Sequence, residues 1–354
     1  MKFIKIILYP SLLISCFLYG INVGRFQSFP FNSIQVLNYA LKKPWRLKND
    51  RLLAELAKTN NIELNKSPKV FKPNSSILSS DSLKLISFGD NEFKSMKGLL
   101  NSINDQNTSL IIHVGDTQNT DNPCSDSRTD LQRDLMNSLN APVLYTIGDN
   151  EWLDCTDKYK GDKYNLERLA YIRETYFSKN RTLGLKPSNV ENQSYRGYPE
   201  NARLMIKNIA FITAHVLGED NNFDPYRKKN NFEYFEYFNR DQANIDWITK
   251  SFERYKEASA YVVAIHANVL FGKAGFLTYK DFASCLLELS NKYKKPVLLL
   301  VGDSHQFKAF QPLRSRFPFL HVIQNFGYPD KKAIEIEINL SKRIPFNVTK
   351  IIDD

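Results

Sequence analysis

The chain has 354 residues, of which 42% are hydrophobic and 13% aromatic; this is enough apolar material for one large domain or two smaller ones, and it excludes a disordered polymer. A formal net charge of +10 favours acidic ligands. The lysines are scattered, however, and the sequence has no compact basic stripe. We therefore expect no specific nucleic-acid binding.

The first 22 residues predict a signal peptide or a membrane anchor. A short basic start, Met1 to Lys5, precedes an apolar and uncharged run over residues 6–19. The length of this run does not choose between the two, because about 20 apolar residues are needed to cross a bilayer. Leu13-Ile14-Ser15-Cys16 also resembles a bacterial lipobox, which implies a lipid on Cys16, and a buried amino-terminal helix is the remaining alternative. We expect an exported protein of the cell envelope, periplasmic or membrane-anchored outside the cytoplasm.

Residues 23–80 predict a polar tether, rich in Asn and Lys, with one helix at 51–57. From residue 81 to about 345 the patterns of strand and helix alternate, which indicates one layered α/β domain. Helices are expected at 96–103, 128–139, 166–176 and 241–255, and around Phe282 to Leu289. Strands are expected at 85–88, 110–114, 143–147, 203–206, 209–213, 261–265, 297–301, 321–324 and 333–338. A polar insertion at 218–231 is expected to overhang the ends of the strands.

Four Gly-Asp pairs directly follow predicted strands. The pairs are Gly89-Asp90, Gly115-Asp116, Gly148-Asp149 and Gly302-Asp303, and a fifth strand ends at His266. One such pair is typical of a turn or a helix cap. Because an open α/β sheet brings the carboxyl ends of its strands to one edge, the four aspartates with His266 and His305 instead predict a metal site. Carboxylate and imidazole donors of this kind hold Mn, Fe, Zn or Mg.

Two cysteines follow neighbouring strand ends beside this site. Cys124 comes after the second Gly-Asp pair and Cys155 after the third, so a disulfide between them would join the two loops. Metal ligation by the two thiolates is the alternative, although their spacing differs from that of compact thiolate sites. Cys285 lies in an amphipathic helix, where a buried thiol is expected.

Together these motifs resemble the calcineurin-like metallophosphoesterase superfamily. Gly148-Asp149-Asn150-Glu151-Trp152 is similar to the third motif of a bacterial branch that reads Gly-Asp-Asn-Glu-Trp, and Gly302-Asp303-Ser304-His305 to its last motif. The resemblance covers about residues 83–340. It implies a four-layer αββα sandwich, of the α/β (α+β) class, with two divalent metal ions (Mn, Fe or Zn) at the strand ends.

The resemblance also implies a role for each motif residue. Asp116 would bridge both metals, Asp90 and His305 would bind the first, and Asp149, His266 and Asp303 would hold the second. Glu92 stands where the superfamily has a His, so either Glu92 supplies the missing ligand or the first metal is weakly held. Asn150 stands where the catalytic His is usual, and an amide cannot protonate a leaving group. Glu151, His113 and His215 are the alternatives for that acid. His266 is expected to be both a metal ligand and a catalytic residue.

The function implied is metal-dependent hydrolysis of a phosphate ester, small or lipid-linked, by a metal-activated hydroxide at a two-metal site. Arg128, Lys158 and Arg168 are candidates for contacting the substrate, although a surface salt bridge is the usual role of such a residue. His113 and His321 are expected to be hydrogen-bonded core histidines, and His215 is left undecided. No Gly-x-Ser-x-Gly elbow is present, which disfavours a serine hydrolase. The alternative function is a catalytically weakened binding or structural protein tethered to the cell envelope.

Overall fold

The computed structural model describes residues 82–92, 96–118, 124–156, 165–223, 231–270 and 276–353. The predicted anchor at 1–22 and the tether at 23–80 lie outside these residues. Within them, no helix combines the length and the apolar character that crossing a bilayer requires.

Two sheets form the centre of the fold. A five-stranded sheet has the order β12-β11-β1-β2-β3, and a seven-stranded sheet has the order β4-β5-β6-β7-β8-β10-β9. The first contains β1 (Leu83–Phe88), β2 (Leu110–His113), β3 (Val143–Tyr145), β11 (Ala333–Ile338) and β12 (Phe346–Ile352). The second contains β4 (Glu191–Gln193), β5 (Tyr198–Ile206), β6 (Ile209–Thr213), β7 (Ala260–Ala264), β8 (Val297–Val301), β9 (Lys308–Phe310) and β10 (Leu320–Gln324).

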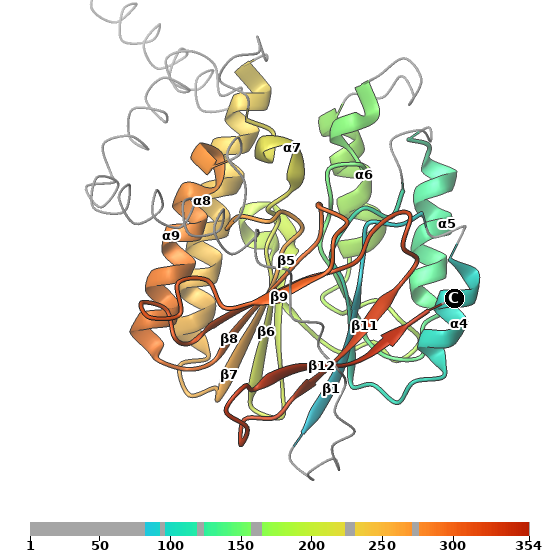
Figure 1. Ribbon diagram of the computed structural model, residues 1–354. Coiled ribbons are helices and arrows are strands. Elements are labelled where there is room, and N and C mark those ends of the chain that lie inside the picture. Colours follow the sequence, from blue (N-terminus) through green and yellow to red (C-terminus); the bar gives the residue numbers. More distant parts are fainter. Residues whose placement is uncertain are drawn as a thin grey trace, which may run out of the picture.

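Helices cover the outer face of each sheet (Figure 1). On one side lie α4 (Lys97–Asn104), α5 (Asp126–Asn137) and α6 (Asn165–Phe177), and on the other side α8 (Asn231–Arg254) and α9 (Phe276–Tyr293). Short helices η2 (Leu153–Thr156), η3 (Ser194–Arg196) and α7 (Gly218–Asn221) lie in the connections. The arrangement confirms the expected α/β class and the four layers αββα.

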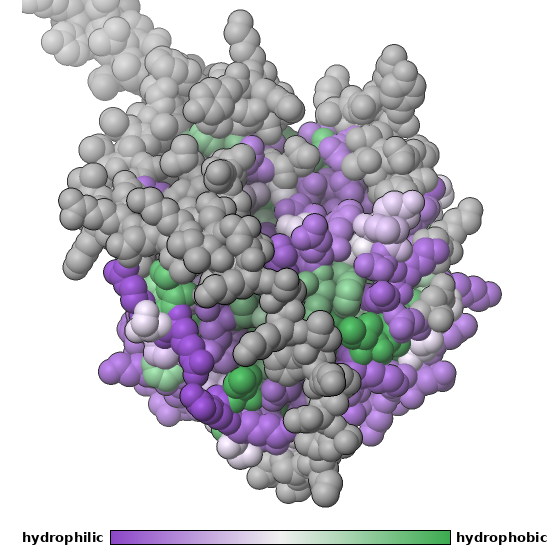
Figure 2. Space-filling model, in the orientation of Figure 1, coloured by the Kyte–Doolittle hydropathy of each residue, from purple (hydrophilic) through white to green (hydrophobic). Residues whose placement is uncertain are grey.

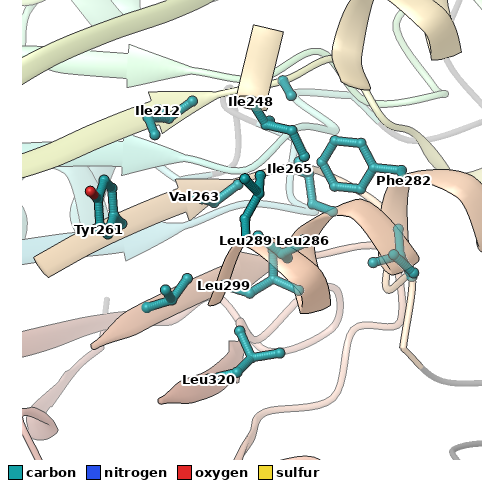
Figure 3. Close-up of a cluster of buried hydrophobic side chains, with 14 of the residues drawn as sticks. Ile212, Ile248, Tyr261, Val263, Ile265, Phe282, Leu286, Leu289, Leu299 and Leu320 are labelled. Carbon is teal, nitrogen blue, oxygen red and sulfur yellow. The ribbon is translucent and has the colours of Figure 1, made fainter. Parts of the chain in front are cut away.

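Three apolar layers hold the four structural layers together. Side chains on alternate positions of a strand point to opposite faces, so Ile86 packs toward α4 to α6 while Leu85 packs between the two sheets. The third layer joins the seven-stranded sheet to α8 and α9, with Val263 and Leu299 facing Ile248 and Phe282 (Figure 3). Strands buried on both faces read as continuous apolar runs, which is why they could be recognised in the sequence.

Two boundaries differ most from those expected. Strand β12 continues the domain past residue 345, because Phe346–Ile352 pairs antiparallel with β11. Helix α8 begins at Asn231, ten residues before the expected start at 241. Its first turns are stabilised by non-local contacts, since the Tyr237 hydroxyl donates to Thr278 O at 2.8 Å. On the face in Figure 2, hydrophilic side chains cover most of the described surface, with apolar side chains in small patches between them.

Parallel pairing sets the position of the functional site. Strand β1 runs parallel to β2, and β2 to β3, in the first sheet; β6, β7 and β8 are parallel in the second. The carboxyl ends of the two sets meet at one end of the sandwich. All four Gly-Asp pairs and His266 follow these ends.

Candidate metal centre

Three of the four Gly-Asp aspartates have a left-handed backbone. Their φ angles are 56° for Asp90, 55° for Asp116 and 68° for Asp303. This region disfavours residues other than glycine, at a cost of roughly 1–2 kcal/mol each. Strain of this kind collects at functional sites, because the surrounding structure must hold it in place.

The aspartates converge on one buried imidazole. The Nε2 atom of His266 lies 2.8 Å from Asp149 Oδ1, 3.5 Å from Asp116 Oδ1 and 3.8 Å from Asp303 Oδ1. Two groups of donors result: Asp90, Asp116 and His266 form one, and Asp149, His266 and Asp303 form the other, with all donor atoms of a group within 4.8 Å of one another. His266, Asp90, Asp116 and Asp149 are buried, and Asp303 is half-buried.

Both candidate histidine ligands are held by a backbone carbonyl. His266 Nδ1 donates to Val114 O at 2.7 Å, and His305 Nδ1 donates to Tyr328 O at 3.0 Å. A carbonyl only accepts, so each bond fixes the tautomer and leaves Nε2 as the ligating atom. This is the usual arrangement of a metal-ligating histidine. His305 is exposed and lies outside the two groups of donors.

Glycines let the loops approach the carboxylates closely. A Cβ on Gly148 would overlap Asp116 Oδ1, and a Cβ on Gly218 would overlap Asp303 Oδ1 and lie 2.6 Å from Asp149 Oδ1. Gly218 begins α7, which brings the expected overhanging insertion directly onto the second group of donors. Sequence reasoning did not single out Gly218 as part of the site, because nothing nearby in the sequence marks this contact.

The charges of the cluster are strongly interdependent. Burial raises the pKa of Asp90 to about 7, and it raises the pKa of Asp116 and of Asp303 as well. Burial alone would lower the pKa of His266, but Asp116, Asp149 and Asp90 raise it well above its usual value. Among the described residues, Asp90 Oδ2 is buried without a hydrogen-bond partner. Carboxylates crowded in this way would be stabilised by cations, and hard oxygen donors with imidazole nitrogen suit the Mn, Fe and Zn expected from the sequence.

Backbone amides fix two of the carboxylates. Asp303 N donates to Asp90 Oδ1 at 2.7 Å, and Asn150 N donates to Asp116 Oδ1 at 3.1 Å. In each pair, the amide and the aspartate belong to loops that follow different strands. The loops therefore position one another, and their carboxylates are preorganised.

Glu92 and Glu151 have other partners than those expected. Arg128 Nη1 donates to Glu92 Oε1 at 2.6 Å, and Glu92 lies outside both groups of donors. Thr117 N and Gly148 N donate to the two oxygens of Glu151, at 2.6 and 3.0 Å. Glu151 thus joins the loops after β2 and β3 through its carboxylate, and its expected catalytic role stays a prediction.

Asn150 also connects the loops after β2 and β3. Its Nδ2 donates to Gln118 O at 3.2 Å, and Gln118 Nε2 donates to Asn150 O at 2.7 Å. Cys124 close by is disulfide-bonded, which makes metal ligation by its thiolate wrong. The side chain of Cys155 lies outside the described residues, so the pairing of the two stays a prediction. Cys285 is half-buried, with Sγ 3.4 Å from Thr249 Oγ1.

The remaining histidines belong to the core. His113 Nδ1 accepts from Gly115 N at 3.2 Å, and His321 Nε2 lies 3.1 Å from Gln311 Nε2, as expected for hydrogen-bonded core histidines. His215 is buried, and its Nδ1 donates to Glu200 Oε1 at 2.8 Å. Burial lowers the pKa of His215 to about 4.

The candidate substrate-binding cations are also engaged elsewhere. Arg168 is fully buried and pairs with Asp126 at 2.7 Å, which gives it a structural role between α5 and α6. Arg128 pairs with Glu92 at the edge of the site. Lys158 lies outside the described residues.

Comparisons with known proteins add a likeness of fold only. No family model matches the chain, and no curated protein matches it. A 5'-nucleotidase from Candida albicans is similar at a TM-score of 0.36 and 11% identity; the match covers 75% of this chain and 48% of the nucleotidase, so the chain spans about half its length. The protein TT1561 of Thermus thermophilus is similar at 0.40 and 10% identity, covering 76% of this chain and 99% of that one. A dimetal phosphatase from Danio rerio is similar at 0.42 and 8% identity, covering 77% of this chain and 98% of that one. Structural likeness at TM-scores this low supports no conclusion about function.

Proposed function

We propose that the protein is a metal-dependent phosphoester hydrolase of the calcineurin-like type, with two divalent cations at the strand ends. The observation that carries the proposal is the pair of donor groups that share the buried His266. Two cations in adjacent sites are a common device for displacement at phosphorus. The proposal also includes export to the cell envelope, which is supported by the sequence of residues 1–22 alone.

The donors divide between two positions. Asp90 and Asp116 would hold the first cation, with His305 closing that side, and Asp149, His266 and Asp303 would hold the second. When bound, such cations lower the pKa of water and offset the charge on phosphoryl oxygens. The chain itself fixes the carboxylates with backbone amides and orients both histidines through Nδ1.

Protonation of the leaving group is the weak step for this chain. The Asn150 amide binds Gln118 O, and the Glu151 carboxylate binds two backbone amides, so neither presents an acid to a substrate. Esters whose leaving group departs as a stable anion need no such acid. We therefore propose that phenol-like leaving groups are favoured over alcohols.

The proposal is tested by stripping the metal, reloading with Mn, Fe or Zn and measuring hydrolysis of an aryl phosphate monoester and diester. Asp116→Asn keeps the oxygen that accepts from Asn150 N but removes the charge. It should lower kcat by at least tenfold. Asp246→Asn on α8, where Asp246 pairs with Lys250 and Arg196 and lies outside both groups of donors, is the matched control and should leave kcat unchanged. Hydrolysis that is undiminished in Asp116→Asn, or absent with every metal, contradicts the proposal.

A second candidate function is metal-dependent binding without efficient turnover. The engagement of Asn150 and the pairing of Glu92 with Arg128 favour it, since both positions depart from the superfamily pattern. Metal bound in stoichiometric amount, with no hydrolysis of any ester tested, would select this candidate.

A further inference from the structure

One segment outside the predicted motifs lies directly against the metal centre. Phe326-Gly327-Tyr328 follows β10, and Tyr328 N donates to Asp90 O at 2.9 Å. Tyr328 O accepts from His305 Nδ1 at 3.0 Å. The backbone of Tyr328 thus contacts Asp90 and His305, two of the three residues proposed for the first cation.

The segment also packs closely against the two candidate ligands. A Cβ on Gly327 would lie 2.6 Å from Asp90 Cβ and 2.8 Å from the His305 ring. The position of Tyr328 relative to the two candidate ligands is therefore fixed by packing as well as by its hydrogen bonds. The Tyr328 side chain therefore branches from backbone that lies next to Asp90 and His305.

Tyr328 is 60% exposed, although its backbone is held on both sides. The neighbouring Phe326 behaves differently: its ring stacks on Phe307 with centroids 4.9 Å apart and an interplanar angle of 12°. Phe326 is thus used in packing. Tyr328 instead keeps most of its ring surface available to a ligand.

We propose that Tyr328 determines substrate specificity by stacking its ring on a flat aromatic leaving group of the phosphoester. Aromatic rings attract one another in offset or edge-on arrangements, and stacking of a base on an aromatic side chain contributes about 1–3 kcal/mol. The substrate class is therefore aryl phosphate esters. A separate observation agrees, because the engaged Asn150 and Glu151 favour phenol-like leaving groups. Since Tyr328 would act on a bound phosphoester, the inference rests on the proposed function.

Three variants test the inference. Tyr328→Ala removes the ring but keeps the backbone N–H and C=O that bind Asp90 and His305, so the ligands keep their positions. Tyr328→Phe keeps the ring. Tyr195→Ala is the matched control, because Tyr195 is 64% exposed but lies in η3, beside β4 and β5 at the opposite edge of the seven-stranded sheet from β10.

The kinetic readout is kcat/KM for phenyl phosphate and for glycerol phosphate. Tyr328→Ala should lower the value for phenyl phosphate about tenfold and leave that for glycerol phosphate unchanged. Tyr328→Phe and Tyr195→Ala should keep both values. An equal loss on the two esters would show a merely structural role, and either that result or no loss on phenyl phosphate overturns the inference.

A binding readout separates this inference from the proposed function. Calorimetry with phenylphosphonate and methylphosphonate measures the preference for a ring without turnover. If the protein hydrolyses no ester but binds phenylphosphonate about tenfold tighter, and Tyr328→Ala removes that difference, the proposed function fails and the aryl subsite stands. If wild type hydrolyses esters but shows no preference for the ring, the subsite fails and the proposed function stands.

Discussion

Glu151 tests whether the third motif supplies a catalytic acid or a structural contact between two loops, which we call the clamp. Its buried carboxylate accepts from Thr117 N and Gly148 N, which belong to the loops after β2 and β3. Glu151→Gln keeps the shape but turns one oxygen into an amide NH₂ that faces a backbone N–H. One hydrogen bond to a charged group is lost and the other loses its charge.

Hydrogen bonds to charged groups contribute about 1.5–3 kcal/mol each, so the variant should lose about 2 kcal/mol of unfolding free energy. Denaturant unfolding of the metal-free protein measures this loss, and Glu253→Gln on the exposed surface of α8 is the control. A clamp predicts lower stability together with weaker metal binding. An unchanged unfolding free energy with turnover abolished would refute the clamp and restore the catalytic role.

Two further predictions follow from the packing of the site and of the core. Gly218→Ala should weaken metal binding roughly tenfold or more, because the added Cβ overlaps Asp303 Oδ1; titration of the metal-free protein with Mn measures this, and unchanged affinity would contradict the packing. His321, whose pKa is lowered by burial to about 4, should make folding sensitive to acid. The folded-state pKa lies below the unfolded value of about 6.5, so between pH 6.5 and 4 the unfolded chain binds more protons than the folded protein. The contribution of His321 to the unfolding free energy is therefore complete above pH 6.5 and is lost as the pH falls toward 4. The unfolding free energy of wild type relative to His321→Gln should therefore fall by about 1 kcal/mol per pH unit between pH 6 and 4, and a difference that stays level would contradict the pKa.

The sequence was most informative where a residue's environment depends on its immediate neighbours. Val297–Val301 is apolar throughout because it is buried on both faces, and Gly302-Asp303 behind it marks the strand end. The same holds for His266 after β7. Such signals predicted the layered fold and which side chains would gather.

The sequence alone does not show which residues far apart along the chain contact each other. Glu92 meets Arg128, which is 36 residues away, and Glu151 meets Thr117, which is 34 residues away. Both glutamates had the right chemistry for a site, yet their partners decide what they do. Strand β12 was missed for a related reason, since most of its residues are partly buried or exposed and give no apolar run.

We propose that the strand ends hold two divalent cations around His266. Counting metal per chain by mass spectrometry, after reloading with Mn and removal of unbound ions, tests this number. Wild type should retain two equivalents, and Asp303→Asn, which alters only the second group of donors, should retain about one. No stoichiometric metal in wild type, or the same count in both proteins, would contradict the account.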